Sequence, residues 1–256
     1  ESERKNRVFL RFQHAVYFDF FLQRRIVSLL ESKDNGSLLP FLERGLLTES
    51  TLELLAYACN SMTVPQITAM IQTCSDAMRQ ESRYQTARQN AGAIVAALLN
   101  ERNSAIDNLR LNWLIFNKVN ICNVSLNHSA LLGCEFFNAK LYGFTIQNTS
   151  FQECQFNSIY IDDSTRIHAS LDELGPVGSI VFNSEQGSRR ILIPSEKAAV
   201  LKRIGIRIPS SVIAKPLTET QKYKIELLDR FLRHMQRSFY FSVDLERKWG
   251  LSNIPD

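Results

Sequence analysis

The clearest pattern in this sequence is an apolar residue at every fifth position along its middle part. The series runs Ile106, Leu111, Phe116, Ile121, Leu126, Leu131, Phe136, Leu141, Ile146, Phe151, Phe156 and Ile161. An α-helix repeats every 3.6 residues and a strand every two, so this spacing indicates an internal structural repeat. A second apolar or small residue lies two positions before each member from Leu111 onward. We therefore expect a β-solenoid over residues 106–163.

This pattern of two inward positions in five resembles the pentapeptide-repeat family. The resemblance implies a right-handed quadrilateral β-helix with four units per coil, in which residues twenty apart lie above one another. Three columns are then expected: Phe116 with Phe136 and Phe156, Leu111 with Leu131 and Phe151, and Cys134 with Cys154. About three coils should form, and both of their ends should be covered by other parts of the chain.

Residues 34–105 are predicted to form a helical domain. Four helices are expected, at Ser37–Leu47, Ser50–Cys59, Thr63–Met78 and Glu81–Asn100. Ser37 is the expected cap of the first helix, and Ser50 with Glu53 forms an expected capping box in the second. The apolar run 93–99 is expected to pack on the first coil of the solenoid. Short helices with short connections favour an antiparallel array.

Near the start of the chain, Val8–Phe12 alternates like a strand, and helical spacing begins at His14. Six residues resemble the end of the winged-helix domain of NACHT-type signalling NTPases: Phe12, His14, Tyr17, Asp19, Phe20 and Phe21. The resemblance implies that residues 1–33 are the end of that domain and the helix that follows it. It also implies that His14 donates a hydrogen bond to a phosphate of bound ADP and holds a closed, inactive state. The alternative is a histidine that only satisfies a strand-to-helix turn.

A phosphate-binding loop of the G-x-x-x-x-G-K-[ST] type does not occur in the sequence. We therefore expect no nucleotide binding by this chain itself, and we predict no catalytic or metal-binding residues and no enzymatic activity. The chain starts without Met. Together with the His14 motif, this suggests an NTPase core that binds ATP or ADP with Mg²⁺ upstream in a longer parent.

Residues 164–256 are expected to form a small α+β domain of winged-helix-like type. The expected elements are strands at Gly178–Phe182, Arg190–Ile193 and Ser238–Val243, and helices at Ser195–Arg203 and Thr220–Arg237. Arg230, Arg233 and Arg237 share one face of the long helix, which suggests binding to nucleic acid or to a protein partner. Against nucleic acid, Glu226 and Asp229 lie close enough along the helix to pair with these arginines.

Composition narrows the class of protein further. The 256 residues are 45% hydrophobic and 22% charged, which is typical of a globular protein with several domains. The five cysteines have no metal-binding spacing, which indicates reduced thiols in a cytoplasmic protein. No apolar run is long enough to span a membrane, and no signal peptide is recognised.

The resulting expectation is a multidomain chain with an all-α helical array, a pentapeptide-repeat solenoid and a small α+β cap. Its predicted function is that of the sensor or regulatory C-terminal part of a NACHT/STAND-type NTPase in antiviral defence. The expected partners are the upstream NTPase core, a protein trigger and other copies of the protein on activation. Two alternatives stay open: a standalone scaffold for protein–protein interaction, and nucleic-acid binding through the basic C-terminal domain.

Overall fold

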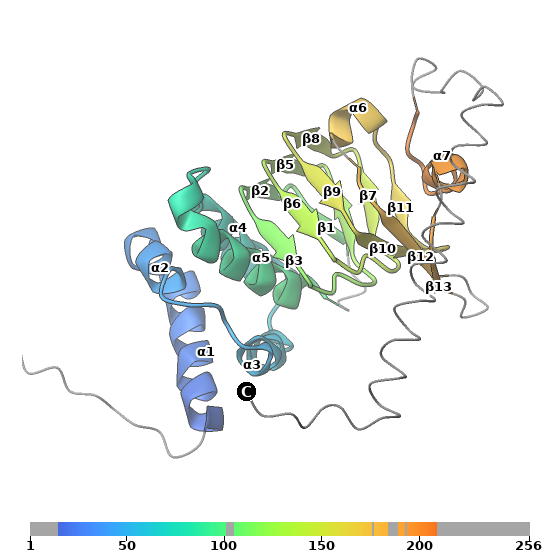
Figure 1. The fold of residues 1–256 in the computed structure, drawn as a ribbon. Helices are drawn as coiled ribbons and strands as arrows, with labels where there is room; N and C mark the ends of the chain where they lie inside the picture. Colours follow the sequence, from blue (N-terminus) through green and yellow to red (C-terminus); the bar gives the residue numbers. More distant parts are fainter. Residues whose placement is uncertain (1–14, 101–104, 176, 184–188, 193, 209–256) are drawn as a thin grey trace, which may run out of the picture. The chain divides into compact units, whose positions relative to one another are not determined.

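The structure is a computed structural model that describes residues 15–100, 105–175, 177–183, 189–192 and 194–208. Helices come first along the chain, and stacked coils of short strands follow them (Figure 1). These residues all belong to one unit that ends at Pro209. The strand predicted at Val8–Phe12, and the helix and strand predicted at Thr220–Arg237 and Ser238–Val243, lie outside the described residues.

The described residues begin with three helices, and polar side chains cap the second and the third. They are α1 (Ala15–Glu31), α2 (Asn35–Leu42) and α3 (Glu49–Cys59). Asp34 caps α2, because its carboxylate accepts a hydrogen bond from the Ser37 N–H at 3.0 Å. Thr48 caps α3 in the same way and accepts from the Thr51 N–H at 3.1 Å. The predicted caps at Ser37 and Ser50 were therefore wrong, since both helices begin earlier than expected and each cap must precede the first helical turn.

The next helices follow the prediction closely. They are α4 (Val64–Asp76), the short 3-10 helix η1 (Ser82–Tyr84) and α5 (Gln85–Leu99). Thr63 and Gln66 form a capping box at the start of α4, and Pro65 occupies its first turn. The apolar face predicted for this helix is buried and consists of Ile67, Met70, Ile71, Cys74 and Met78.

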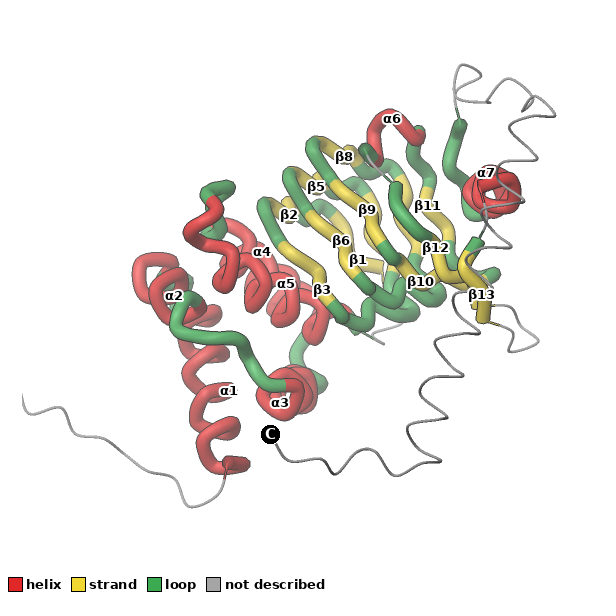
Figure 2. The backbone as a smooth tube through the Cα atoms, viewed as in Figure 1, coloured by secondary structure: helices red, strands yellow, loops and turns green. Residues whose placement is uncertain are grey.

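The solenoid has four sides, as the resemblance to pentapeptide-repeat proteins implies (Figures 1 and 2). Its first three coils contain β1 (Ala105–Asp107), β2 (Arg110–Asn112), β3 (Ile115–Asn117), β4 (Ser125–Asn127), β5 (Ala130–Leu132), β6 (Glu135–Phe137), β7 (Thr145–Gln147), β8 (Ser150–Gln152) and β9 (Gln155–Asn157). Strands in successive coils pair in parallel at a spacing of twenty residues, for example Ile106 with Leu126. Single bridges that join Asn120, Lys140 and Tyr160 form the fourth side.

The repeat of five has a cause in the backbone as well as in the core. From residue 108 to residue 158, every fifth residue has a positive φ of about 48–63°. These corner residues are Asn108, Trp113, Lys118, Asn123, His128, Gly133, Asn138, Gly143, Asn148, Glu153 and Ser158. Asn and Gly adopt the left-handed region most readily, which explains their frequency at the corners. Each corner turns the chain onto the next side of the coil.

The coils do not stop at residue 163, where about three were expected to end. β10 (Ile159–Asp162), β11 (Arg166–Ile167) and β12 (Ile180–Asn183) continue the stacking into a fourth coil. Here the paired residues are 21 apart, as in Ile146 with Ile167 and Ile161 with Phe182. The shift occurs beside a turn in which Asp162 accepts hydrogen bonds from the N–H groups of Ser164 and Thr165. One extra residue therefore interrupts the five-residue period of the sequence, although the stacking of coils continues.

The last elements are α6 (Leu171–Leu174), β13 (Arg189–Ile191) and α7 (Pro194–Arg203). β12 and β13 pair in antiparallel fashion, which confirms the predicted hairpin. The predicted helix at Ser195–Arg203 corresponds to α7. Because β12 also pairs with β10, the hairpin extends a sheet of the solenoid.

A single hydrophobic core runs from Ile26 in α1 to Ile206 after α7. In its centre Phe116, Phe136 and Phe156 stack with ring centroids 4.7 and 4.6 Å apart, which confirms the predicted column. Helix α5 lies directly on β3, so the packing predicted for the run 93–99 against the first coil is also confirmed (Figure 1). The helices and the solenoid therefore share one continuous hydrophobic core.

Candidate functional site

The four residues singled out from the sequence, His14, Arg230, Arg233 and Arg237, lie outside the described residues. Their roles in sensing ADP phosphate and in binding nucleic acid or a partner therefore stay predictions. The structure does describe the later part of the His14 motif, which lies on the first two turns of α1.

Asp19, one of these motif residues, fastens α1 to the start of α3. Its side chain is buried and only 6% exposed. Its Oδ1 atom accepts hydrogen bonds from the hydroxyls of Thr51 at 2.8 Å and Thr48 at 2.9 Å. The hydrogen bond from Thr51, followed by that from Thr48, lowers the pKa of Asp19 below its ordinary value. An ionised carboxylate thus joins the motif helix to the cap of a second helix.

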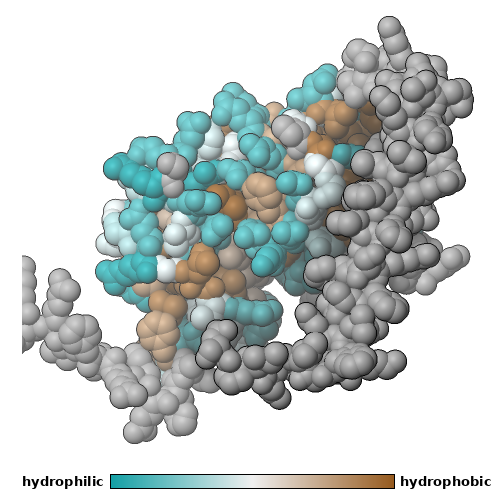
Figure 3. Space-filling model, viewed as in Figure 1, coloured by the Kyte–Doolittle hydropathy of each residue, from teal (hydrophilic) through white to brown (hydrophobic). Residues whose placement is uncertain are grey.

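The same two turns of α1 carry a group of exposed aromatic side chains. Their exposed fractions lie between 46% and 59%, and the residues are Tyr17, Phe18, Phe20 and Phe21. The rings of Phe20 and Phe21 meet edge to face, with centroids 5.6 Å apart. Apolar surface is visible where α1 begins (Figure 3). Exposed aromatic groups of this size are typical of a contact surface.

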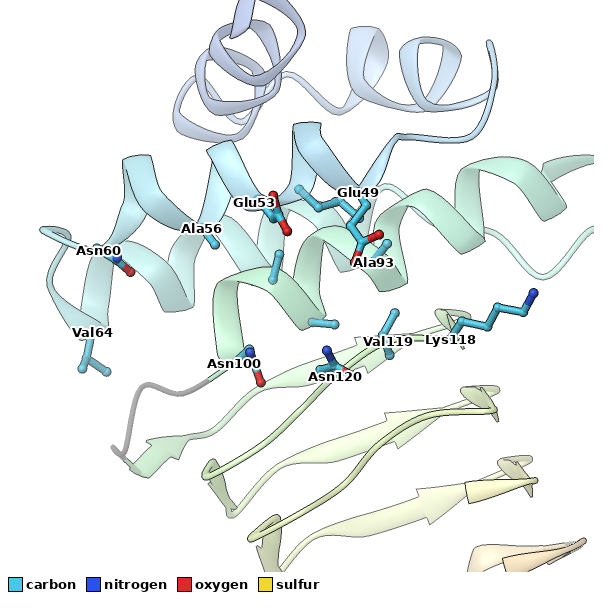
Figure 4. A pocket seen from close by; sticks show the side chains of 13 residues that line it. Glu49, Glu53, Ala56, Asn60, Val64, Ala93, Asn100, Lys118, Val119 and Asn120 are labelled. Carbon is cyan, nitrogen blue, oxygen red and sulfur yellow. The ribbon is translucent and has the colours of Figure 1, made fainter. Parts of the chain in front are cut away.

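A groove between α3, α5 and the first coil has a volume of about 750 Å³ (Figure 4). It is lined by Glu49, Leu52, Glu53, Ala56, Asn60, Val64, Ala93, Ala96, Ala97, Asn100, Lys118, Val119 and Asn120. Figure 4 shows Glu49 and Glu53 on the α3 side and Lys118, Val119 and Asn120 on the coil side. The floor is apolar and made of small side chains, and the walls are polar.

Sequence reasoning missed this groove because three separate parts of the chain form it. Glu49 and Glu53 lie one turn apart on α3, which the sequence alone describes only as an ordinary solvated helix face. Only the docking of α5 on β3 brings the first coil opposite these carboxylates. No periodicity in the sequence carries that information.

The predicted cysteine column is present, and its side chains are buried in the hydrophobic core. Cys134 and Cys154 are buried, and their thiols also donate to the carbonyls of Leu111 and Leu131 at 3.3 and 3.4 Å. Burial raises the pKa of the Cys134 thiol well above its ordinary value. Burial likewise raises the pKa of Cys74 to about 12. The thiols of Cys74 and Cys134 are therefore held protonated at neutral pH, whereas the hydrogen bond with Cys134 lowers the pKa of Cys154 to about 7.

The described residues hold no group of three His, Cys, Asp or Glu side chains that could bind a metal ion. Within the same residues, no helix combines the length and apolar character that crossing a membrane requires.

The chain matches no protein-family model, no curated protein and no solved structure in comparisons with each. The likeness to pentapeptide-repeat proteins therefore rests on the five-residue period and on the solenoid. The likeness to NACHT-type NTPases rests on the motif within residues 12–21.

Proposed function

We propose that this chain is the sensor or regulatory part of a NACHT/STAND-type signalling NTPase in antiviral defence. It recognises a trigger and relays this event to the nucleotide switch of an upstream core that binds ATP or ADP with Mg²⁺. The chain itself performs no chemistry in this proposal, and it acts in the cytoplasm. Activation brings copies of the whole protein together.

Continuity between the motif helix and the solenoid is the observation that best supports a relay. One buried core extends from α1 to the fourth coil, and Asp19 ties the first turns of α1 to α3. Close-packed interiors transmit strain because they deform little. A partner that displaces the solenoid would therefore move α1 with it and draw His14 away from the ADP phosphate.

The test uses the full protein encoded by the gene that contains this chain. His14→Ala should release ADP faster and raise basal signalling, because one hydrogen bond to the phosphate is lost. His168→Ala, at an exposed position without a left-handed backbone, is the matched control and should leave both unchanged. If His14→Ala released ADP at the same rate as the wild type, His14 would have no role in the nucleotide switch.

The groove beside α3 favours a second candidate function, that of an interaction scaffold. In this case the chain binds a protein partner without any nucleotide switch, and the motif of residues 12–21 only packs helices. The two candidates differ in one measurable property. The scaffold binds its partner equally with and without ADP in the full protein, whereas the sensor does not.

A further inference from the structure

We propose that the groove between α3, α5 and the first coil binds an extended, basic peptide segment of a partner protein. The peptide adds as a short strand to the edge of the first coil at Asn120, and its Lys or Arg side chains pair with Glu49 and Glu53. This inference does not depend on membership of a signalling NTPase, since it rests on the groove alone.

Most of the first coil's outer edge is closed by side chains of the helices. An open edge of paired strands leaves N–H and C=O groups that other chains can join. Here side chains of α4 and α5 and of the residue that follows α5 bond to those groups directly. The pairs are Gln72 with both backbone groups of Arg110, Ser75 with the Asn112 N–H, Arg88 with the Trp113 C=O, and Asn100 with the Cys122 N–H, at 2.6–3.3 Å.

Asn120 is the place where this closure is missing. The neighbouring Val119 C=O and Ile121 N–H both bond to Lys140 in the second coil at 2.8 Å. Because backbone groups alternate in direction along a strand, the N–H and C=O of Asn120 point away from the second coil. Within the described residues neither of these two groups has a hydrogen-bond partner. They form an open donor and acceptor pair at the groove.

The floor of the groove allows a peptide backbone to come close. Ala93, Ala96 and Ala97 of α5 form it together with Val119, and Leu52 is the largest apolar side chain in the lining. A volume of about 750 Å³ lies within the range of about 300–1,000 Å³ that is typical of ligand pockets. A strand that pairs with Asn120 would lay its alternate side chains on this floor.

Charge selects the kind of peptide. Glu49 and Glu53 are exposed on the α3 wall, and neither makes an ion pair with another described residue. Lys118 lies on the coil side (Figure 4). Two carboxylates along one wall attract a segment that carries Lys or Arg and repel an acidic segment or a nucleic-acid backbone. The wall therefore fits a basic partner.

The test measures fluorescence anisotropy of a labelled peptide added to the full chain. The probe is acetyl-Thr-Val-Lys-Val-Lys-Val-Thr-amide, an extended, basic peptide whose two Lys side chains lie on the same face of a strand, and its comparison peptide has Glu in place of both Lys residues. We expect saturable binding of the basic peptide only, and weaker binding at high salt. Glu49→Gln with Glu53→Gln should weaken binding about five-fold. Glu43→Gln, an exposed carboxylate outside the groove, is the matched control.

A second peptide tests strand addition without changing the protein. Methylation of the backbone nitrogens of alternate peptide residues removes N–H groups that could donate to the Asn120 C=O. Of two peptides, one methylated at the odd-numbered and one at the even-numbered residues, one should therefore bind about ten-fold more weakly than the other. Equal binding of both methylated peptides, equal binding of the acidic peptide, or unchanged affinity of the double Gln variant would overturn the proposal. Absence of any peptide binding would overturn it too. This includes the case in which a second copy of the chain fills the groove, which would make the sedimentation coefficient of the protein depend on its concentration.

Discussion

Among single residues, Asp19 shows how a residue of a recognised motif also serves the packing of the helices. The motif alone suggests a part in nucleotide sensing. The structure gives this carboxylate two hydroxyl donors, Thr48 and Thr51, at the cap of α3. A buried acceptor that holds two donors is difficult to replace.

Asp19→Ala should lower the free energy of unfolding by about 1–3 kcal/mol, because it leaves the buried Thr51 hydroxyl with one acceptor fewer. Asp19→Asn should lower it less, since the amide oxygen still accepts. Urea denaturation followed by circular dichroism measures both. A stability of Asp19→Ala equal to that of the wild type would show that α1 is held by its apolar face alone.

The contribution of Asp19 should also depend on pH. Its pKa in the folded protein is lowered from 3.8, chiefly by the hydrogen bond from Thr51. The contribution is therefore complete above the unfolded pKa and is lost as pH falls through the lower folded value. The stability difference between the wild type and Asp19→Asn should shrink between pH 6 and pH 3. A difference that stays constant across this range would contradict the assignment.

The five cysteines should react very differently with iodoacetamide. Cys122 is partly exposed, whereas Cys59, Cys74, Cys134 and Cys154 are buried. Because the thiolate is the reactive form, burial and a raised pKa protect Cys74 and Cys134. Mass spectrometry should find mainly one modified thiol in the folded protein and five after denaturation. Loss of the early modification in Cys122→Ser identifies it, and early modification of Cys134 would contradict a buried column.

At the scale of elements, the contact between α5 and β3 depends on one glycine. A Cβ atom at Gly92 would lie 2.2 Å from the carbonyl oxygen of Ile115, a backbone atom that cannot move aside alone. Alanine is favoured over glycine inside a helix by about 1 kcal/mol, so the clash and the helix propensity act in opposite directions. The clash should dominate.

Gly92→Ala should therefore lower the free energy of unfolding by about 1–3 kcal/mol. Gly45→Ala is the matched control, since nothing lies within 4 Å of its added Cβ atom, and it should change stability by less than about 0.5 kcal/mol. Chemical denaturation of both variants provides the comparison. Equal stability of the two variants would mean that α5 can shift on β3 at little cost.

The elements also show what the sequence could predict. The five-residue period identified the solenoid, because inward positions in a solenoid repeat directly along the chain, and the resemblance to pentapeptide-repeat proteins implied the four sides and with them the phenylalanine and cysteine columns. The fourth coil was missed because one added residue beside Asp162 shifts Ile167 out of the series. The caps at Asp34 and Thr48 were missed because a Ser two or three residues later matched the same local pattern. The groove depends on tertiary docking, which no local pattern encodes.

At the scale of the whole molecule, the described helices and coils share one core. Phe136 lies at its centre, between Phe116 and Phe156 in the ring stack. Its side chain is 1% exposed. A substitution at this position should destabilise the helices as well as the coils.

Phe136→Ala should lower the free energy of unfolding by about 3–5 kcal/mol, the usual effect of truncating a buried aromatic side chain. The helical circular dichroism signal and the fluorescence of Trp113, followed in a Trp249→Phe background, should be lost in one transition. Phe137→Ala, a neighbouring and partly exposed residue, is the control and should have a smaller effect. Two separate transitions would show that the helices and the solenoid fold independently.

Residues twenty apart occupy the same place in successive coils, and this restricts how such a body can change its length in evolution. Duplication or loss of twenty residues joins positions that already overlie one another, so the body grows or shrinks by one strand spacing of about 4.8 Å with both ends unchanged. Insertions that are not multiples of five would turn inward side chains outward unless a local turn accommodates the extra residues. The added residue beside Asp162 is accommodated in the local turn, so Ile167 and Phe182 still lie over Ile146 and Ile161. We therefore expect relatives of this solenoid to differ in length by whole coils, or by residues that a turn between two sides can accommodate.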